Sequence, residues 1–355
     1  MTGDYRSVII GASGGRARHH ALAYRYQARA RLVAVSARTA EPRDKLAADY
    51  GVPTRYDDYR EMLARERPDV VHVNTPPSVR LEVLEQVAAA GVPAAIVEKP
   101  VAIDGPDSAA LAAFARTSPL RVAVNHQLHY HAPRRRLQRL VADGGIGAVR
   151  YIDAGSGMNA AYQGTHSLQA VFAFAGAARP TAVLAQAAGT DGLQPTPRAH
   201  YAPDDLLAAI DFAGGLRAVL RCGSGAPRQD DAPPAARDQV WAHKRIAVYG
   251  ERGHAIWSMW SWETLCDGRL QRGRHDYWEQ DGPAQAALVG SVLHWIEHPD
   301  YRHPLALECA TEQYAVLLAA YRSALQRRAV TLPEATQEPV IEVLRDALGG
   351  VASGD

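Results

Sequence analysis

Short apolar strands alternate with segments that can be helical along the first 125 residues, and this alternation limits the possible folds more than any other feature. The expected strands are residues 6–12, 30–37, 69–77, 92–100 and 120–127. Nearly continuous apolar strands that each lead into a helix are typical of a parallel sheet covered by helices on both faces. The sequence therefore predicts a doubly wound parallel α/β domain over residues 1–124.

The pattern changes after about residue 125, where strands begin to follow one another through glycine turns. Residues 206–225 and 244–257 each resemble two strands joined by such a turn. Two helices are expected near the end of the chain, at residues 283–298 and 306–328. We therefore predict a second α/β domain over residues 125–355, with an open and mostly antiparallel sheet.

Composition restricts the possible partners. The chain has 355 residues, and its 39 basic and 38 acidic residues are mixed, so the net charge is only +1. This balance argues against electrostatic binding of nucleic acid or of an acidic membrane surface. Cys222, Cys266 and Cys309 are widely spaced, and neither an export signal nor a membrane-spanning apolar run is visible. We expect a reduced cytoplasmic protein that binds neither nucleic acid nor a membrane.

The turn after the first strand is rich in glycine and opens a helix. Glycines at this position let the backbone approach the pyrophosphate of a dinucleotide in a Rossmann-type domain. The match to the G-x-G-x-x-G pattern is partial, because Gly11 takes the first place, Ser13 the second and Arg16 the third, with Gly14 and Gly15 between them. An ordinary glycine-rich turn is the alternative, and the position after the first strand favours cofactor binding.

The end of the second strand bears on the choice of cofactor. An acidic residue there usually binds the adenosine ribose, whereas an arginine suits a 2′-phosphate. This chain has Ser36, Ala37 and Arg38 and no acid. NADP is therefore slightly favoured over NAD, and a solvated arginine on a surface turn is the alternative interpretation.

Several segments in order resemble the Gfo/Idh/MocA oxidoreductases, the relatives of glucose–fructose oxidoreductase and inositol dehydrogenase. The segments that carry the resemblance are residues 69–102, 120–127, 160–171 and 244–257. It extends over nearly the whole chain, and its most specific motif is Glu98-Lys99-Pro100. The resemblance implies a Rossmann domain that binds NAD or NADP, followed by a substrate-binding domain whose open sheet often packs against another subunit. A homodimer or homotetramer is therefore expected.

By this resemblance, Lys99 lies beside the nicotinamide and the reacting carbon, and Glu98, Thr75 and Pro76 belong to the cofactor site. The chemistry is reasonable in itself. A hydride leaves a secondary alcohol only as the hydroxyl proton is removed, and a lysine desolvated at a strand end can take that proton. A surface Glu-Lys pair after a strand is the alternative.

A second catalytic segment departs from the family pattern. The resemblance implies that His166, Asn125 and His126 face the substrate. Tyr162 stands where the family has an aspartate, and Gln169 replaces another acid. A phenol is not a carboxylate at neutral pH, so we expect a changed substrate or reaction direction, with Tyr162 still in the site. A purely structural histidine is the alternative for His166.

Two further groups of residues have simpler explanations. His129 and His131 are two residues apart, but no acidic or cysteine partner is evident, so no metal is expected. Trp257, Trp260 and Trp262 are expected to pack in the core or at a subunit contact, with stacking on a sugar ring as the alternative.

Together these features predict an NAD(P)-dependent oxidoreductase acting on a secondary alcohol or ketone of a sugar, aminosugar, cyclitol or sugar-like small molecule. One alternative is a redox-neutral lyase, epimerase or glycosidase that uses the bound cofactor transiently. Another is a cofactor-binding regulator without activity, which the partial glycine motif and Tyr162 would suit. A net change in nicotinamide absorbance distinguishes the first reading from the other two.

Overall fold

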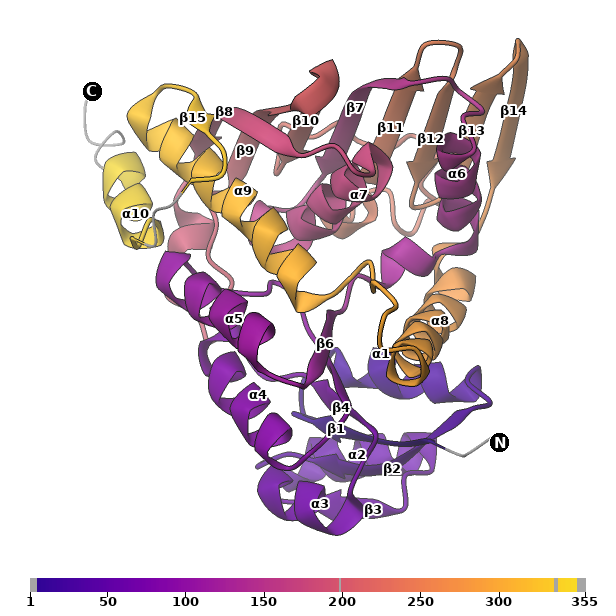
Figure 1. The fold of residues 1–355 in the computed structure, drawn as a ribbon, viewed down its shortest axis with the longest axis vertical. Helices are drawn as coiled ribbons and strands as arrows, with labels where there is room; N and C mark the ends of the chain where they lie inside the picture. The colour runs from indigo at the N-terminus through magenta and orange to yellow at the C-terminus, as the bar shows by residue number, and fades with distance from the viewer. Residues whose placement is uncertain (1–4, 198, 335–337, 350–355) are drawn as a thin grey trace. The chain divides into compact units, whose positions relative to one another are not determined.

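A computed structural model describes residues 5–197, 199–334 and 338–349 (Figure 1). The chain divides into two compact units. The first comprises the chain up to Val101 with Ala109–Tyr130 and Trp278–Thr311, and the second comprises Ala102–Ser108, His131–Tyr277 and the chain from Glu312 onward. The boundary expected after residue 124 lies close to the end of the segment at Tyr130, and the structure also groups residues 278–311 with the first unit.

The first unit contains a six-stranded parallel sheet. Its strands are β1 (Tyr5–Ile10), β2 (Ala30–Ser36), β3 (Thr54–Tyr56), β4 (Val70–Val73), β5 (Ala94–Val97) and β6 (Arg121–Val124). They lie in the order β3-β2-β1-β4-β5-β6, and every adjacent pair is parallel. The order reverses between β1 and β4, and such a switch point is where doubly wound sheets bind dinucleotides. The predicted doubly wound sheet is confirmed.

Helices connect these strands. They are α1 (Ala17–Leu22), α2 (Ala40–Tyr50), α3 (Tyr59–Glu66), α4 (Arg80–Ala89) and α5 (Gly105–Thr117), with the short helices η1 (Ala23–Arg25), η2 (Pro77–Val79) and η3 (Gln127–Tyr130). Local sequence explains some of their ends. The side chain of Asp58 accepts a hydrogen bond from the N–H of Arg60 and caps α3. Gly51 ends α2 in the left-handed conformation, with φ of 66°.

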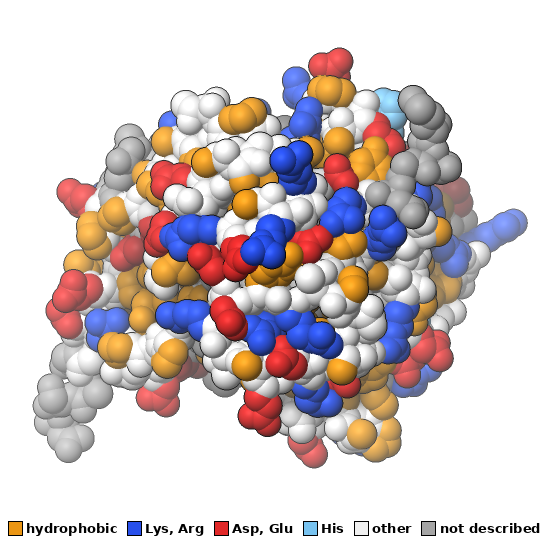
Figure 2. Space-filling view, turned by 90° about the horizontal axis from the view of Figure 1, so that it is seen from below, with side chains coloured by type: hydrophobic (Ala, Val, Ile, Leu, Met, Phe, Trp, Pro, Cys, Tyr) orange, Lys and Arg blue, Asp and Glu red, His pale blue; other side chains and the backbone are white. Residues whose placement is uncertain are grey.

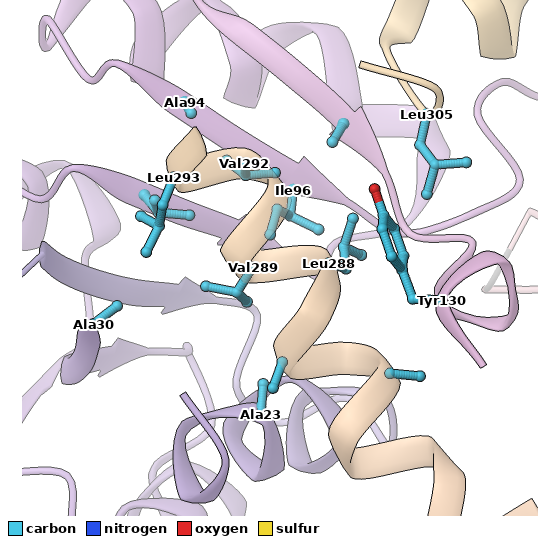
Figure 3. Packing of buried hydrophobic residues seen from close by; sticks show 14 residues of the cluster. Ala23, Ala30, Ala94, Ile96, Tyr130, Leu288, Val289, Val292, Leu293 and Leu305 are labelled. Atoms are coloured by element: carbon cyan, nitrogen blue, oxygen red, sulfur yellow. The ribbon is translucent and has the colours of Figure 1, made fainter. Parts of the chain in front are cut away.

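Helix α8 (Tyr277–Glu297) supplies much of the core of the first unit (Figure 3). Its Leu288, Val289 and Leu293 are fully buried in one cluster with Ile96 of β5. Burial of each such side chain contributes about 1.5–3 kcal/mol to folding. The helix is therefore an integral part of the first unit, although most of the second unit precedes it in the sequence.

The second unit contains a nine-stranded sheet in the order β14-β13-β12-β11-β7-β10-β9-β8-β15. Its strands are β7 (Val149–Ser156), β8 (Pro180–Ala188), β9 (Asp205–Phe212), β10 (Arg217–Cys222), β11 (Lys244–Gly250), β12 (His254–Ser258), β13 (Ser261–Cys266), β14 (Arg269–Arg274) and β15 (Val330–Thr331). Only β7 and β10 pair in parallel; the other adjacent pairs are antiparallel. The prediction of a mostly antiparallel second sheet is confirmed.

Helices pack against this sheet. The helical elements are α6 (Ala132–Ala142), η4 (Ala160–Gly164), α7 (Thr165–Ala175), η5 (Asp191–Leu193), η6 (Ala213–Gly215), η7 (Val240–Ala242), α9 (Leu307–Gln326) and α10 (Ile341–Gly349). Helix α7 packs on β7 and β11, and α6 packs on β12. Along β9 buried and exposed residues alternate, as expected for a strand with one covered face.

The surface is mixed in charge. Figure 2 shows one face of the molecule, on which Lys and Arg side chains are interspersed with Asp and Glu side chains. Within the described residues, no helix combines the length and the apolar composition that crossing a bilayer requires.

Candidate cofactor and catalytic site

The turn after β1 requires glycine at its first position. Gly11 has φ of 83°, and a side-chain carbon placed there would lie 3.0 Å from the carbonyl carbon and oxygen of Asn74, which follows β4. The N–H groups of Gly11 and Ala12 donate to the carbonyl oxygen of Ser36 at 2.9 and 3.0 Å. The carboxyl ends of β1, β2 and β4 therefore meet at this turn, at the switch point of the sheet.

The other predicted cofactor residues from these strand ends differ in exposure. Ser13, Gly14, Gly15, Arg38 and Pro76 are exposed, Arg16 and Thr75 are half-buried, and Ser36 is buried.

Some buried polar atoms at this edge of the sheet make no hydrogen bond within the described residues. The Oγ1 atom of Thr75 and both polar side-chain atoms of Asn74 are buried without a hydrogen-bond partner among the described residues. Buried polar atoms without partners are uncommon in folded proteins. Together with the close approach at Gly11, they make this edge suitable for a dinucleotide, which presents many polar atoms.

The Glu98-Lys99 pair follows β5 directly and is buried. Glu98 is 7% exposed and Lys99 is 9% exposed. Burial lowers the pKa of Lys99 to about 8, although the neighbouring Glu98 carboxylate acts in the opposite direction. The amine can therefore exist in both protonation states near neutral pH. The peptide bond between Lys99 and Pro100 is cis.

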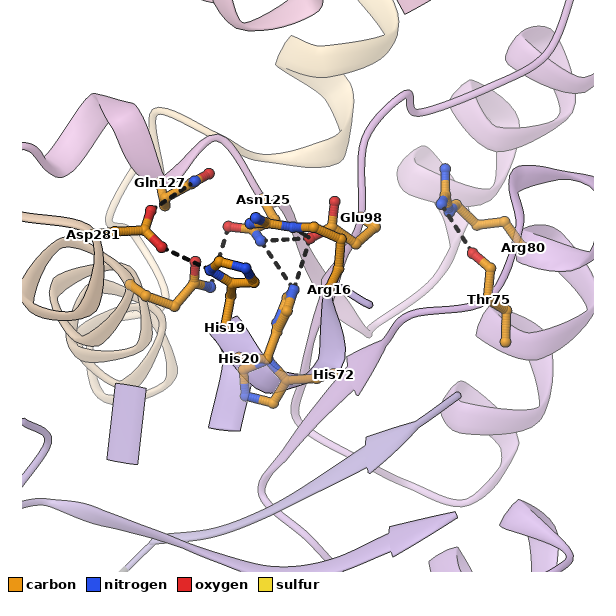
Figure 4. Close-up of polar contacts among 11 residues, drawn as sticks. Arg16, His19, His20, His72, Thr75, Arg80, Glu98, Asn125, Gln127 and Asp281 are labelled. Carbon is orange, nitrogen blue, oxygen red and sulfur yellow. Dashed lines mark hydrogen bonds and ion pairs between the residues drawn. The ribbon is translucent and has the colours of Figure 1, made fainter. Parts of the chain in front are cut away.

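Three side chains donate hydrogen bonds to one carboxylate oxygen of Glu98 or lie in contact with it (Figure 4). Asn125 Nδ2 and His20 Nε2 each lie 2.8 Å from Glu98 Oε1, and Arg16 Nε lies 3.2 Å away. Burial alone would raise the pKa of Glu98, but Arg16 and His20 outweigh it and hold that pKa well below its usual value. Glu98 is therefore an ionised carboxylate beside Lys99. The amide oxygen of Asn125 accepts a hydrogen bond from Gln285 at 3.2 Å.

Arg80 connects the segments that follow β4 and β5. Its side chain is fully buried at the start of α4. Nη1 donates to the carbonyl oxygens of Pro100 and Val101, the latter at 2.9 Å, and Nη2 donates to that of Thr75 at 3.4 Å. Arg80 therefore holds the segment that follows the Glu98-Lys99 motif in a fixed relation to the segment that follows β4.

A second buried carboxylate comes from α8. Asp281 Oδ2 lies 2.9 Å from Nδ1 of His19, and its Oδ1 accepts a hydrogen bond from Gln127 at 3.0 Å (Figure 4). Burial opposes ionisation, but His19, Arg16 and Gln127 together hold the pKa of Asp281 well below its usual value. Beside Asn125, the predicted substrate residue His126 is 5% exposed.

The other predicted substrate residues lie in the second unit. His166 is 4% exposed in the first turn of α7, and Tyr162 is half-buried in η4, a π-helical turn. Asn159 Oδ1 accepts a hydrogen bond from the N–H of Tyr162 at 3.1 Å, and the ring of Tyr162 packs edge-on against His200. The structure thus brings Arg16, Glu98, Lys99 and Asn125 together in the first unit. It places Tyr162 and His166 on two consecutive helical elements of the second unit, η4 and α7.

Gln169, three residues after His166, accepts a hydrogen bond from a buried arginine. Arg134 is 1% exposed, and its Nη2 donates to Gln169 Oε1 at 3.0 Å. Burial lowers the pKa of Arg134 to about 9. The buried guanidinium therefore has a neutral amide oxygen as its acceptor.

The histidines and tryptophans noted in the sequence pack within the protein. His131 is buried in ring contact with Trp257 and Tyr277, and His129 packs edge-on against Tyr130. Trp257 and Trp260 are buried, as expected for core residues, and Trp262 is half-buried. Among the described residues, the one group with metal-ligand spacing is His294, Glu297 and His298, which is exposed and was not singled out from the sequence.

Comparison with known proteins identifies the first unit. Residues 5–126 match the model of the Gfo/Idh/MocA family, an oxidoreductase family with an NAD-binding Rossmann fold. The matched residues include all six strands of the parallel sheet. The predicted resemblance to this oxidoreductase family is confirmed over these residues, and the fold they match is an NAD-binding Rossmann fold. No curated protein matches the chain.

Solved structures of similar fold extend over nearly the whole chain. An oxidoreductase from Agrobacterium radiobacter in complex with NAD+, L-tartaric acid and magnesium is 16% identical, with a TM-score of 0.76 over 92% of this chain and 98% of that one. Levoglucosan dehydrogenase with NADH and levoglucosan is 15% identical, with a TM-score of 0.77 over 93% and 100%. WlbA dehydrogenase from Bordetella pertussis with NADH and UDP-GlcNAcA is 18% identical, with a TM-score of 0.70 over 93% and 99%. At these identities the likeness establishes the fold.

Sequence reasoning missed several polar residues of the first unit. His20, His72, Arg80 and Asp281 are all buried and hydrogen-bonded near the Glu98-Lys99 motif. A partial signal was present for Arg80, which is a charged residue between the apolar Val79 and Leu81 at the start of α4. No local pattern marks the other three residues, because their partners lie far away in the sequence.

Proposed function

We propose that this protein is an NAD(P)-dependent oxidoreductase that transfers a hydride between the nicotinamide and a secondary alcohol or ketone of a sugar, aminosugar, cyclitol or sugar-like small molecule. The observation that carries the proposal is the buried Lys99, with a pKa of about 8, at the carboxyl edge of an NAD-binding parallel sheet. A polyhydroxylated substrate is supported by the levoglucosan, tartaric acid and UDP-GlcNAcA bound to proteins of the same fold.

Lys99 supplies the proton chemistry in this proposal. When bound, the nicotinamide accepts a hydride from an alcohol carbon or returns one to a ketone carbon. In the oxidation, neutral Lys99 takes the hydroxyl proton as the C–H electron pair leaves and the C=O bond forms. In the reduction, protonated Lys99 delivers a proton to the oxygen as the hydride arrives at carbon. A pKa near 8 makes both forms of the amine accessible.

The cofactor would lie against the turn at Gly11 and the end of β4. Gly11 leaves the backbone open to close approach, and Asn74 and Thr75 provide buried polar atoms without partners among the described residues. Arg38 is exposed two residues after the end of β2, where its charge would favour the 2′-phosphate of NADP(H). We therefore propose that NADP(H) binds at least as tightly as NAD(H).

We also propose that Tyr162 and His166 contribute to the substrate site, with His166 assisting proton transfer and Tyr162 shaping the pocket. The burial of His166 and the anchoring of η4 by Asn159 support defined positions for both side chains.

A homodimer or homotetramer is supported by Leu184 and Leu207, which are exposed on the neighbouring strands β8 and β9. Light scattering of the purified protein measures this state directly.

The test is turnover of a panel of sugars, keto-sugars, cyclitols, uronic acids and hydroxy acids with NAD+, NADP+ and their reduced forms. Absorbance reports net hydride transfer, and NMR of the products reports any redox-neutral reaction. A substrate turned over by the wild type and by Lys45→Ala, but not by Lys99→Ala, is the expected result. Lys45 is a matched control because it is an exposed lysine of α2. Product formation without an absorbance change would replace this proposal by a redox-neutral one.

A further inference from the structure

Behind Glu98, the side chains of His20 and His72 (Figure 4) and of Tyr24 form a hydrogen-bonding chain in the first unit. His20 Nδ1 lies 2.7 Å from His72 Nδ1, and His72 Nε2 lies 2.7 Å from the hydroxyl of Tyr24. His20 Nε2 is the atom that lies 2.8 Å from Glu98 Oε1. Both histidines are 0% exposed, so solvent does not compete for these contacts.

The geometry allows only one arrangement of protons when both imidazoles are neutral. Glu98 is ionised, so the nitrogen facing it at 2.8 Å must carry a hydrogen, which makes His20 the Nε2–H tautomer. Its Nδ1 is then an acceptor, and His72 must donate from Nδ1–H. His72 Nε2 is in turn an acceptor, and the hydroxyl of Tyr24 donates to it.

The surroundings favour this neutral arrangement. Burial lowers the pKa of both His20 and His72, so neither ring gains a proton readily. Burial also raises the pKa of Tyr24, so its phenol keeps the proton that it donates. The amide nitrogen of Asn125, which also lies 2.9 Å from His20 Nε2, has the Glu98 oxygen as its nearer acceptor at 2.8 Å.

We propose that His20 is a positioning residue for the Glu98-Lys99 pair, and that His72 and Tyr24 hold His20 in the one tautomer that can donate to Glu98. The consequence is a carboxylate fixed in orientation and charge next to the amine of Lys99. Its negative charge raises the pKa of Lys99 and so opposes the effect of burial. The catalytic consequence rests on the proposed function, whereas the tautomers and the ionisation of Lys99 do not.

Substitutions at His20 or Glu98 do not remove the other charged groups near the Glu98-Lys99 pair. Arg16 faces both Glu98 and Lys99 and lowers the pKa of each. His19 in α1 and Asp281 in α8 form their own contact at 2.9 Å. A shift in the pKa of Lys99 on removal of His20 is therefore attributable to the change at Glu98.

The first experiment reads the tautomers in the wild-type protein without substrate. Side-chain ¹⁵N NMR at neutral pH should show His20 protonated on Nε2 and His72 on Nδ1, with neither ring an imidazolium. Single His20→Leu and His72→Leu variants assign the two signals. A hydrogen on Nε2 of His72, or an imidazolium at either position, would overturn the proposal even if the variants were to fold poorly.

The second experiment follows the ionisation of Lys99, also without substrate. The chain has three lysines, Lys45, Lys99 and Lys244, so labelled lysine gives a spectrum that single substitutions can assign. The pKa of Lys99 should fall in Glu98→Gln, and should fall in the same direction but less far in His20→Leu. His20→Gln, which keeps a donor, should restore it toward the wild-type value. An unchanged or higher pKa of Lys99 in a folded His20→Leu variant would contradict the positioning role.

A matched control comes from the same unit. His303 is another buried histidine, and it bonds to Ser291 and Tyr130 rather than to this chain of residues. His303→Leu should leave the pKa of Lys99 unchanged. Once a substrate is known, His20→Leu should lower kcat by about 10–100-fold with KM nearly unchanged, which is the range known for loss of a residue that hydrogen-bonds a metal ligand. A protein that passes the NMR tests but turns over no alcohol would fail only the proposed function.

Discussion

The pH dependence of alcohol oxidation should follow the ionisation of Lys99. Only the neutral amine can take the hydroxyl proton, whereas only the ammonium form can supply a proton to a ketone. Oxidation should therefore speed up as pH rises through the pKa of Lys99, and reduction should slow down over the same range. Opposite pH dependences of the oxidation and reduction rates distinguish a proton-transfer role of Lys99 from a purely structural one.

The size of the effect follows from the pKa of about 8 that burial gives to Lys99. At that pKa the neutral fraction is about one tenth at pH 7 and about nine tenths at pH 9. Between these values kcat/KM for oxidation should rise roughly tenfold, and that for reduction should fall by roughly the same factor. Lys99→Ala should lose the dependence and about 10²–10⁴-fold in turnover.

The assay is the initial rate of nicotinamide absorbance change in both directions, measured at saturating cofactor across this pH range. Lys45→Ala controls for the loss of a lysine as such, because its side chain is 74% exposed. Cofactor affinity, measured separately by fluorescence, should be little affected in Lys99→Ala. An oxidation rate that is flat or falls with pH, or a Lys99→Ala enzyme with the wild-type profile, would refute the assignment.

Three further predictions concern other residues. Arg38→Ala should weaken NADP(H) binding more than NAD(H) binding in calorimetric titrations; a clear preference for NAD(H) that the variant leaves unaltered would show that Arg38 does not select the cofactor. Tyr162→Phe should retain much of the activity while His166→Ala loses most of it; a Tyr162→Phe enzyme as inactive as a catalytic knockout, with folding intact, would make the phenol a proton-transfer group. Gln169→Leu should lower the free energy of unfolding by about 1–3 kcal/mol, because it leaves the guanidinium of Arg134 buried without this acceptor. Urea titration measures this change, and an unchanged unfolding midpoint would count against the contribution of that hydrogen bond.

Much of the fold could be predicted because its signals are local. The apolar runs that became β1, β2, β4, β5 and β6 each lie within a window of about ten residues, so composition and glycine turns suffice to find them. The exception is β3, which covers only Thr54–Tyr56 and is too short to show a pattern. The glycine turns after residue 200 likewise indicated antiparallel strands, although the parallel pairing of β7 with β10 was not visible in the sequence.

The candidate site was only partly predictable, because only some of its signals are local in the sequence. Motif residues such as Gly11 and Lys99 stand out because a turn or a strand end places specific demands on the residue itself. The buried histidines behind Glu98 do not stand out in the sequence. Glu98 meets His20 across 78 positions of sequence, and His20 meets His72 across 52.

The sequence by itself determined most strands of the first unit, the doubly wound sheet that they form and the position of the Glu98-Lys99 motif at a strand end. Those features depend on the periodicity of apolar residues and on backbone demands that each residue meets locally. Only the tertiary structure decided that α8 completes the core of the first unit and that Asp281 faces His19. It also decided that a buried chain of two histidines and a tyrosine ends on Glu98, because burial and hydrogen-bond partners are set by residues that folding brings together from distant positions.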